Sequence, residues 1–388
     1  MDPARDKRSA WKRLRPFEKR LVAVAVALVL IAASFSAYYE LSLKGGGKRT
    51  LVVYTYSSFM AYGANKTAAF NTVFGTFEKE YNVNIIVRTP YLGLLPTLQA
   101  QGNNPQADIV IGLTNMDGIL AAKSGLLVKY TPPAAQYINT TLKNEMGSAS
   151  AYLTPYEYAY LGIDYNKSMF QPTGSTFTPT FQNLTNSTAA SNLLLENPST
   201  DSTGEGFLLW EIAYYQHVLN ENWTTWWNAV KPYVGGHIYP SWDQAFAQFE
   251  TGPGTNLVAS YLTDPAYNEY FGYGNGTGST PVYHSGTAYG WRTIYCIGIV
   301  NGSKNISLDK EFVNYFLGPT VQNEVPQNEW MYPANETIAL PASFGYAVNQ
   351  STIVPLNDFL NASTIAENLQ SPQSWVLQWQ LMFQGAGA

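Results

Sequence analysis

The segment ADIVIGL, residues 107–113, decides the fold class. It is a short apolar run between polar residues, as is typical of a buried strand. Two similar runs precede it, TLVVYTY at 50–56 and NVNIIVR at 82–88. Apolar residues at helical spacing separate these runs, at about 66–80 and 92–101. Strands that alternate with helices at this distance predict an α/β fold with a mainly parallel sheet.

The ends of these strands indicate where a ligand would bind. Ligands of such sheets bind beyond the carboxyl ends of the strands. YTYSSF at 54–59 and GLTN at 112–115 are therefore expected at the edge of a site. A helix over about 115–124, closed by Gly125, follows the third strand.

The α/β pattern resumes in a second block, which predicts two lobes. The expected elements are a strand at 193–195, a helix at 202–219 with Ser202 or Thr203 as N-cap, a strand at 256–262, a turn-rich loop at 263–278, and an amphipathic helix at 310–325 broken at Gly318-Pro319. The sequon-rich stretch 178–200 reads as a loop before the strand.

Composition narrows the function classes. The chain has 388 residues, of which 46% are hydrophobic and only 13% are charged, with a net charge of -5. These values indicate a large core and give no electrostatic case for nucleic acid. The single cysteine, Cys296, excludes an internal disulfide. His217, His237 and His284 have no metal-ligand spacing, and no catalytic set is recognisable, so neither an enzyme nor a cofactor or metal site is expected.

The N-terminus predicts a membrane segment. Residues 1–20 are strongly basic, and residues 21–39 carry no charge. This length spans a bilayer core, and the basic flank predicts a cytoplasmic N-terminus. A cleaved signal peptide is the alternative interpretation. Residues 40–49 then form a linker, and the rest of the chain is expected outside the cell, anchored or secreted.

Glycosylation sequons are frequent beyond this segment. They begin at Asn65, Asn139, Asn166, Asn183, Asn186, Asn222, Asn275, Asn301, Asn305, Asn335, Asn349 and Asn361. Glycans at several of them would favour solubility in a chain with few charges. A composition rich in amides and hydroxyls is the simpler explanation.

Aromatic residues in polar loops are the strongest signal of a binding site. NEWMYPANET, residues 328–337, places Trp330 and Tyr332 in a loop without helical or strand periodicity. Other aromatics at strand ends or beside turn residues are Tyr54, Tyr56, Trp242, Tyr261 and Tyr267. Such side chains either pack against the core and hold their loops in place, or stack on a flat or cationic ligand. The helix start near Thr203 could in addition hold a phosphate or a hydroxyl, or be an ordinary cap.

Seven segments resemble one family in chain order, the thiamine-binding proteins of ABC importers, within the wider group of periplasmic binding proteins. They are VVYTYSSF (52–59), QADIVIGLTN (106–115), TPYEYAYLGIDYNKSMF (154–170), NPSTDSTGEGFLLW (197–210), SYLTDPAYNEY (260–270), QNEVPQNEWMYPANETIALPASF (322–344) and WVLQWQ (375–380). The Trp-Met-Tyr-Pro and Ser-Tyr-x-Thr-x-Pro-Ala-Tyr motifs are fairly specific.

The resemblance implies a ligand and its contacts. Thiamine has a cationic thiazolium, an aminopyrimidine plate and a hydroxyethyl arm that can carry phosphate. The match implies that aromatic residues line a cleft and that a helix start holds the arm. The implied ligand-binding residues are Tyr56, Ser57, Ser202, Thr203, Gly204, Trp242, Tyr261, Thr263, Asp264, Tyr267, Trp330 and Tyr332.

Two positions depart from the family pattern. Ser57 stands where the family has an aspartate, and Pro90-Tyr91 replace an acidic-Gly pair. Glu329 or Asp264 could supply the missing charge. A receptor for a polyamine, which needs several carboxylates where this chain shows few, remains an alternative. So does one for ferric iron, with Tyr214-Tyr215 as ligands, although their mid-helix position favours core packing.

The sequence therefore predicts a two-lobe α/β fold of the periplasmic-binding-protein type, with a ligand cleft between the lobes and an N-terminal anchor. Lobe 1 would contain residues 50–155 and 285–388, and lobe 2 residues 156–284. The expected function is capture of thiamine or its phosphate by a monomer. Delivery to a permease with its ATPase is implied by the family. A glycosylated surface structural or adhesion protein is the alternative from another class.

Overall fold

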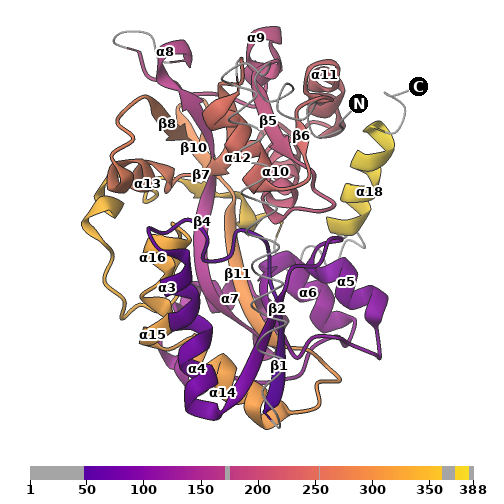
Figure 1. Ribbon diagram of the computed structural model, residues 1–388. Helices are drawn as coiled ribbons and strands as arrows, with labels where there is room; N and C mark the ends of the chain where they lie inside the picture. The colour runs from indigo at the N-terminus through magenta and orange to yellow at the C-terminus, as the bar shows by residue number, and fades with distance from the viewer. Residues whose placement is uncertain (1–47, 171–174, 253, 361–371, 384–388) are drawn as a thin grey trace, which may run out of the picture.

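The chain forms two α/β lobes that share one mixed sheet (Figure 1). The computed structural model describes residues 48–170, 175–252, 254–360 and 372–383. The central strands follow the order β2-β1-β3-β11-β4-β7-β5-β6. The predicted two-lobe α/β class is confirmed.

Lobe 1 is the lower lobe in Figure 1. Its parallel strands are β1 (Arg49–Tyr54), β2 (Val83–Arg88) and β3 (Ile109–Thr114). Its helices are α3 (Lys66–Phe70), α4 (Thr76–Tyr81), α5 (Leu94–Gln101), α6 (Asn115–Lys123), α7 (Thr140–Glu145), α14 (Ile306–Phe316), α15 (Pro319–Gln322) and α16 (Val325–Asn328). A π-helical turn, Asn71–Gly75, joins α3 to α4, and 3-10 turns lie at Pro133–Tyr137 and Gly147–Ala151.

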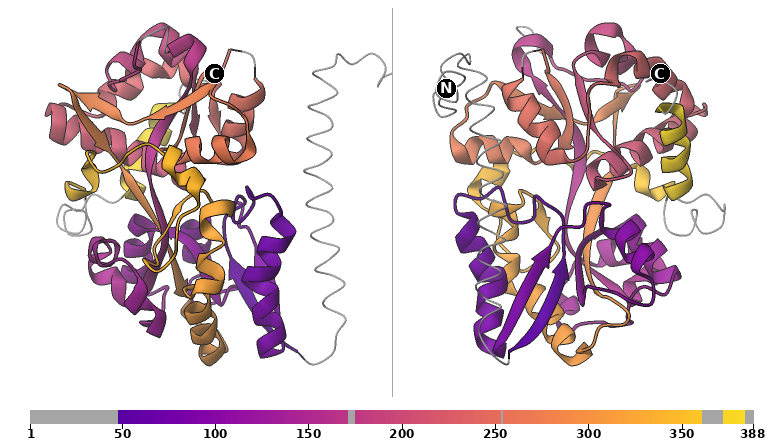
Figure 2. Two further views of the ribbon diagram at one scale, coloured as in Figure 1. Left: turned by 90° about the vertical axis from the view of Figure 1, so that its left-hand side faces the viewer. Right: turned by 45° about the vertical axis from the view of Figure 1, so that its right-hand side comes forward.

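The two ends of the sequence meet in lobe 1. Figure 2 shows α14, from late in the chain, beside α3 and α4 near its start. Phe77 of α4 packs edge-on against Phe312 of α14, with ring centroids 5.1 Å apart. The helical spacing predicted for 66–80 is thereby explained, because it buries Phe74 and Phe77 in this contact.

Lobe 2 is the upper lobe in Figure 1. Its strands are β5 (Leu193–Glu196), β6 (Ile238–Tyr239), β7 (Leu257–Tyr261) and β8 (Thr277–Thr280), with a small sheet of β9 (Val282–His284), β10 (Thr287–Gly290) and β13 (Val354–Pro355). Its helices are α8 (Lys167–Phe170), α9 (Ser187–Ala190), α10 (Ser202–Ala213), α11 (Thr224–Val234), α12 (Trp242–Thr251), α13 (Asp264–Phe271) and α18 (Pro372–Phe383). A π-helical turn extends α10 over Tyr214–Leu219, and 3-10 turns lie at Asn183–Thr185, Ala342–Tyr346 and Leu356–Asp358.

Two strands run between the lobes, β4 (Leu153–Asn166) and β11 (Arg292–Ile299). The first half of β4 pairs antiparallel with β11, and its second half pairs antiparallel with β7. The prediction of a mainly parallel sheet is therefore wrong for the centre of the sheet. The chain enters lobe 2 along β4 and returns along β11, so these two strands must run in opposite directions.

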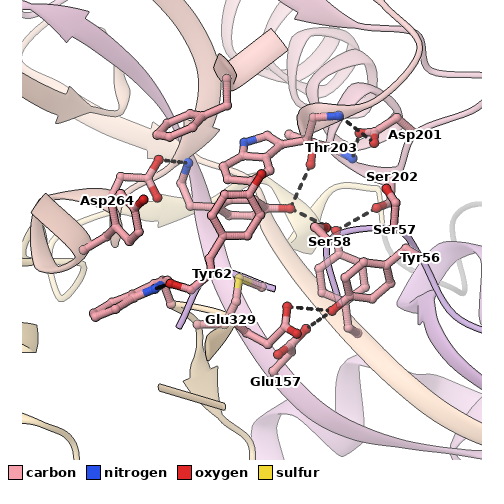
Figure 3. Close-up of a pocket in the computed structure, with 17 residues that line it drawn as sticks. Tyr56, Ser57, Ser58, Tyr62, Glu157, Asp201, Ser202, Thr203, Asp264 and Glu329 are labelled. Atoms are coloured by element: carbon pink, nitrogen blue, oxygen red, sulfur yellow. Dashed lines mark hydrogen bonds between the residues drawn. The ribbon is translucent and has the colours of Figure 1, made fainter. Parts of the chain in front are cut away.

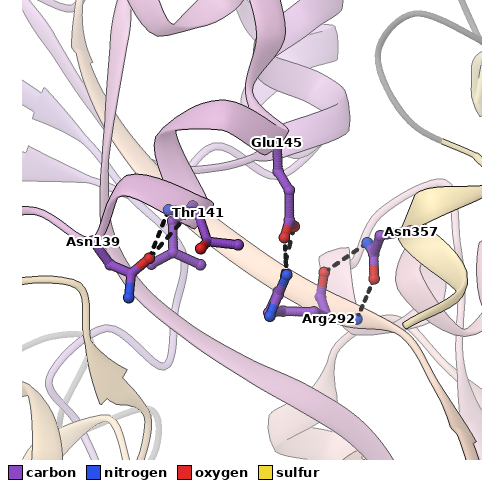
Figure 4. Close-up of polar contacts among 6 residues, drawn as sticks. Asn139, Thr141, Glu145, Arg292 and Asn357 are labelled. Atoms are coloured by element: carbon purple, nitrogen blue, oxygen red, sulfur yellow. Dashed lines mark hydrogen bonds and ion pairs between the residues drawn. The ribbon is translucent and has the colours of Figure 1, made fainter. Parts of the chain in front are cut away.

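Polar contacts fasten the start of β11 (Figure 4). The Arg292 guanidinium forms an ion pair with Glu145 at the end of α7. The backbone N–H of Arg292 donates to Asn357 Oδ1 at 2.7 Å, and Asn357 Nδ2 donates back to the Arg292 carbonyl at 2.9 Å. Asn139 caps α7 by accepting from the N–H of Thr141. The crossing strand is thus held from both lobes.

The terminal helix α18 packs on lobe 2. Trp379 lies edge-on to Trp227 of α11, with ring centroids 5.7 Å apart, and Phe383 contacts the same indole. The helix therefore belongs with lobe 2 and not with lobe 1, where the sequence predicts it. Its aromatic face is buried against α11, which lies within the range predicted for lobe 2.

Two local predictions are corrected. The N-cap of α10 is Asp201, not Ser202 or Thr203, because its carboxylate accepts hydrogen bonds from the N–H groups of Thr203 and Gly204. The stretch 263–278 is not a continuous loop, since it begins with α13 and ends in β8. Pro265 in the first turn of α13 supports that helix, because an N–H is not needed there.

Within the described ranges, no helix is both long and apolar enough to span a bilayer. The basic segment 1–20, the predicted anchor or signal at 21–39 and most of the linker 40–49 lie outside the described residues, as does Asn361.

Most sequon asparagines lie at the surface, and several have a structural role. Asn65, Asn139, Asn186 and Asn305 cap helices. The prediction of a glycosylation site at Asn335 is corrected, because the side chain of this residue is buried. Its Nδ2 donates to the Leu317 carbonyl at 3.0 Å, so a glycan at this amide would disrupt the fold.

Candidate functional site

A cavity lies between the lobes (Figure 3). It encloses about 680 Å³ of empty space, open solvent at its mouth included. Both lobes contribute to its wall: the lining residues are Tyr56, Ser57, Ser58, Tyr62, Glu157, Asp201, Ser202, Thr203, Trp242, Phe246, Tyr261, Asp264, Tyr267, Tyr295, Glu329, Trp330 and Met331. Aromatic rings and carboxyl groups dominate this set, which is suited to a flat cationic ligand.

Two glutamates and a tyrosine form a polar part of the lobe 1 wall. The Tyr56 hydroxyl lies 2.8 Å from Glu157 Oε1 and 3.1 Å from Glu329 Oε2. The N–H of Met60 donates to the other oxygen of Glu329. Burial raises the pKa of Glu157 to about 8. Burial, and then the neighbouring Glu157, raise the pKa of Glu329 well above its usual range. A bound cation would stabilise the ionised form of both groups.

A chain of four hydroxyls forms another part of the wall. Ser202 Oγ lies 2.7 Å from the Tyr295 hydroxyl, which lies 2.9 Å from that of Tyr261. The Tyr261 hydroxyl is 3.0 Å from Thr203 Oγ1. Each hydroxyl can donate or accept a hydrogen bond, so these four linked hydroxyl groups can bind a neutral hydroxyl of a ligand.

Asp201 joins the starts of two helices beside these hydroxyls. Its Oδ1 accepts from Thr203 N at 2.8 Å and Gly204 N at 3.3 Å, at the start of α10. Its Oδ2 accepts from Trp242 N at 3.0 Å, at the start of α12. Burial raises the pKa of Asp201 to about 6, against the lowering effect of these three backbone donors.

Aromatic rings enclose the other side of the cavity. Tyr62 of lobe 1 lies edge-on to Trp242 of lobe 2, with centroids 4.9 Å apart. Trp330 lies edge-on to Tyr267 across the same boundary at 5.4 Å. Trp242 stacks on Phe246 at 4.7 Å, and its indole N–H donates to Ser260 Oγ at 2.9 Å. These contacts fix the ring faces before a ligand arrives.

The loop that carries Trp330 is constrained. Trp330 has a φ of +56°, in the left-handed region that costs a non-glycine residue about 1–2 kcal/mol. Its indole N–H donates to the Tyr62 carbonyl at 2.9 Å, and the ring is only 4% exposed. Strain of this kind is typical of ligand-binding positions. The polar loop therefore holds its tryptophan in the wall of the cavity rather than in water.

Hydrogen bonds close the cleft at its rim. Ser57 Oγ donates to Asp243 Oδ2 at 2.6 Å, and the Tyr62 hydroxyl donates to Asp243 Oδ1 at 2.7 Å. Ser57 and Tyr62 belong to lobe 1, whereas Asp243 lies in α12 of lobe 2. A carboxylate of the opposite lobe thus occupies the place beside Ser57, where the family resemblance had left one missing.

The structure brings nine of the twelve sequence-predicted residues to the cavity wall. They are Tyr56, Ser57, Ser202, Thr203, Trp242, Tyr261, Asp264, Tyr267 and Trp330. Gly204, Thr263 and Tyr332 do not line it.

Each of the three exceptions has a packing role instead. Gly204 faces lobe 2, where a Cβ would lie 2.5 Å from the Glu196 carbonyl oxygen. Thr263 is fully buried, just before α13. Tyr332, in the short strand Tyr332–Pro333, stacks on Tyr158 of β4 with centroids 5.5 Å apart.

Several lining residues were missed by sequence reasoning. They are Ser58, Tyr62, Glu157, Asp201, Phe246, Tyr295 and Met331, while Glu329 was considered only as a source of charge. The cavity has four carboxyl groups, so the expectation of few carboxylates is wrong. Glu157 and Tyr295 lie in β4 and β11, where a strand pattern indicates only core.

The residues considered for iron lie elsewhere. Tyr214 and Tyr215 are buried in lobe 2, and the Tyr214 hydroxyl donates to the Tyr283 carbonyl at 2.9 Å. In the described part of the chain, no group of three or more His, Cys, Asp or Glu side chains could hold a metal ion. Cys296 is buried and unpaired with another cysteine.

Comparison with known proteins identifies the class of receptor to which this cleft belongs. The family model for the bacterial extracellular solute-binding protein matches residues 62–323. The chain therefore belongs to the bacterial extracellular solute-binding protein family.

Two curated relatives are named for thiamine. The thiamine-binding periplasmic protein of Brucella suis is 28% identical over 325 residues, covering 82% of this chain and 89% of the relative. That of Escherichia coli is 27% identical, covering 86% and 93%. A solved periplasmic thiamin binding protein has the same fold, with a TM-score of 0.68 at 23% identity over 87% of this chain and 96% of its own.

Proposed function

We propose that this chain is the extracytoplasmic receptor of an ABC importer and captures thiamine between its two lobes. The observation that carries the proposal is the composition of the interlobe cavity, in which aromatic faces surround buried carboxyl groups. The names of the curated relatives support the choice of ligand.

Each part of thiamine has a suitable counterpart. Trp242, Tyr267 and Trp330 present ring faces and edges to the aminopyrimidine and the thiazolium. A cation over such a ring contributes about 0.5–2 kcal/mol. Glu157 and Glu329 offer negative charge where the positive ring would lie, and the hydroxyls of Ser202 and Thr203 would bind the hydroxyethyl arm. No bond in the ligand needs to change, so the proposed role is transport and not catalysis.

Capture would proceed by hinge closure. The ligand enters an open cleft, the lobes rotate about β4 and β11, and the bonds from Ser57 and Tyr62 to Asp243 form. The closed receptor, a monomer at the outer face of the membrane, would deliver thiamine to a permease driven by an ATPase. Residues 21–39 would anchor the receptor or direct its secretion, and exposed sequons such as those at Asn222 and Asn275 would carry glycans.

The test is a fluorescence titration of the full-length chain in mild detergent. We expect thiamine to quench tryptophan emission saturably at about micromolar concentration or lower. Trp330→Ala should abolish this response. Trp379→Phe, in α18 away from the cavity, is the control and should preserve it. Failure of thiamine to bind would overturn the proposal and leave the family assignment intact.

A polyamine is the second candidate ligand, because the cavity holds four carboxyl groups. Aromatic walls and carboxylates also suit an extended polycation. Titration with spermidine under the same conditions distinguishes the two. Quenching by spermidine and not by thiamine would favour the polyamine.

A further inference from the structure

We propose that this cavity selects the unphosphorylated alcohol form of its ligand, and that Asp201 is the residue that rejects phosphate esters. The inference rests on the proposed function, since it concerns which form of thiamine is captured. It follows from how the carboxylate of Asp201 is placed where two helices begin.

The helix starts that would attract a phosphate already have an anion. Free N–H groups and the helix dipole make such ends favourable for negative charge. Here Asp201 accepts from the N–H groups of Thr203 and Gly204 in α10 and of Trp242 in α12. Figure 3 shows Asp201 beside Ser202 and Thr203 in the cavity wall. A phosphate at this end would meet a carboxylate in place of its donors.

The charges of the cavity act in the same direction. Its wall includes Glu157, Asp201, Asp264 and Glu329. Among the described residues that line it, none is lysine, arginine or histidine, so no cationic side chain of the wall can neutralise a phosphate. Like charges at short range in a partly buried site repel strongly. A cationic ligand without a phosphate avoids this repulsion.

The hydroxyl chain beside Asp201 matches a neutral alcohol. Ser202, Thr203, Tyr261 and Tyr295 are linked by contacts of 2.7 to 3.0 Å. An additional hydroxyl can join such a chain by donating one bond and accepting another. A phosphate would require several donors at once, and each hydroxyl has only one proton to donate.

The experiment compares thiamine with thiamine monophosphate by calorimetric titration of the full-length chain in mild detergent. A pH of about 8 keeps Asp201 ionised, because burial raises its pKa only to about 6. We expect thiamine to bind at least about tenfold more tightly than its monophosphate. Equal affinity, or tighter binding of the monophosphate, would overturn the inference and leave the proposed function standing. Binding of neither compound would overturn both.

Substitutions test the role of Asp201 itself. Asp201→Asn keeps an oxygen that can accept from Thr203 N and removes the charge, so the preference for thiamine should fall to about threefold or less. Asp309→Asn is the matched control, because Asp309 is a buried aspartate of α14 that does not line the cavity, and the preference should persist there. An undiminished preference in folded Asp201→Asn, or an equal loss in Asp309→Asn, would overturn the assignment to Asp201. Thermal unfolding verifies that each variant is folded. The comparison of thiamine with its monophosphate on the unmodified protein does not depend on these variants.

Discussion

The Tyr62 hydroxyl donates a 2.7 Å hydrogen bond to Asp243 and thereby joins lobe 1 to lobe 2 at the rim of the cavity. The same carboxylate accepts from Ser57 Oγ. The chain therefore adopts a closed arrangement in which one side chain of α12 holds two groups of the opposite lobe. Closure and ligand affinity should depend on these contacts.

Tyr62→Phe removes one of them while keeping the ring that packs on Trp242. Because the open form competes with closure, we expect thiamine affinity to fall about tenfold, equivalent to about 1.4 kcal/mol. Calorimetric titration measures the change. Tyr233→Phe, at an exposed position of α11, is the control and should not alter affinity. An unchanged dissociation constant in Tyr62→Phe would show that this bond does not stabilise the closed form.

Glu329→Gln should raise the stability of the ligand-free protein and lower its affinity for thiamine. Glu157 is buried, Glu329 is partly buried, and both lie within reach of one tyrosine hydroxyl, so replacing Glu329 by a neutral amide removes the cost of holding its carboxyl group beside Glu157 and away from water. We expect the melting temperature of the ligand-free protein to rise by about 2–4 °C and thiamine affinity to fall about tenfold. Differential scanning calorimetry with and without thiamine tests both parts. A variant that loses stability and keeps its affinity would contradict the role given to this carboxylate.

Acidification should stabilise the ligand-free protein. Asp117 of α6 in lobe 1 and Glu205 of α10 in lobe 2 interact electrostatically, and burial raises the pKa of Asp117 to about 7. Burial, and then Asp117, raise the pKa of Glu205. Both groups have a higher pKa in the folded protein than the roughly 4 of an unfolded chain. The folded state therefore binds more protons than the unfolded state from about pH 4 to about 7. The free energy of unfolding should therefore fall as the pH rises through this window.

Urea unfolding at several pH values measures this slope. Asp117→Asn removes one titrating group and relieves the other, so the slope should become shallower. Glu221→Gln, at an exposed position of lobe 2, should leave it unchanged. A slope that is identical in Asp117→Asn and the unmodified protein would exclude this pair as its source.

Gly204→Ala should destabilise lobe 2. The added Cβ would lie 2.5 Å from the carbonyl oxygen of Glu196, a backbone atom that cannot turn aside. Overpacking of this kind costs about 1–3 kcal/mol. Gly236→Ala is the matched control, because nothing lies within 4 Å of its added Cβ. Equal unfolding midpoints in urea for the two variants would contradict the close approach of α10 to β5.

Local pattern was sufficient for the first three strands of lobe 1, for the helices between them and for most of the aromatic wall. Trp330 could be found because a tryptophan in a polar loop without periodicity has no place in a regular core pattern. Glu157 and Tyr295 could not be found in this way. They lie in β4 and β11, and only the passage of these strands between the lobes brings the two side chains to the cavity.

Asp201 shows a different limit. Asp201, Ser202 and Thr203 are consecutive, and all three residue types are good N-caps. Their positions in the sequence do not determine which of the three side chains is the N-cap of the helix. The decision depends on α12, whose first N–H also binds Asp201 and draws the carboxylate to the point between the two helices. That helix lies about forty residues further along the chain.

The insertion of lobe 2 between the two parts of lobe 1 also orders the folding of the growing polypeptide. β3 ends at Thr114, whereas its neighbour β11 begins only at Arg292. Such distant pairing is slow, and until it occurs one edge of β3 has no strand beside it. β5, β6 and β7 are synthesised in between and can pair first. The first half of lobe 1 is therefore the stretch of the nascent chain most exposed to aggregation.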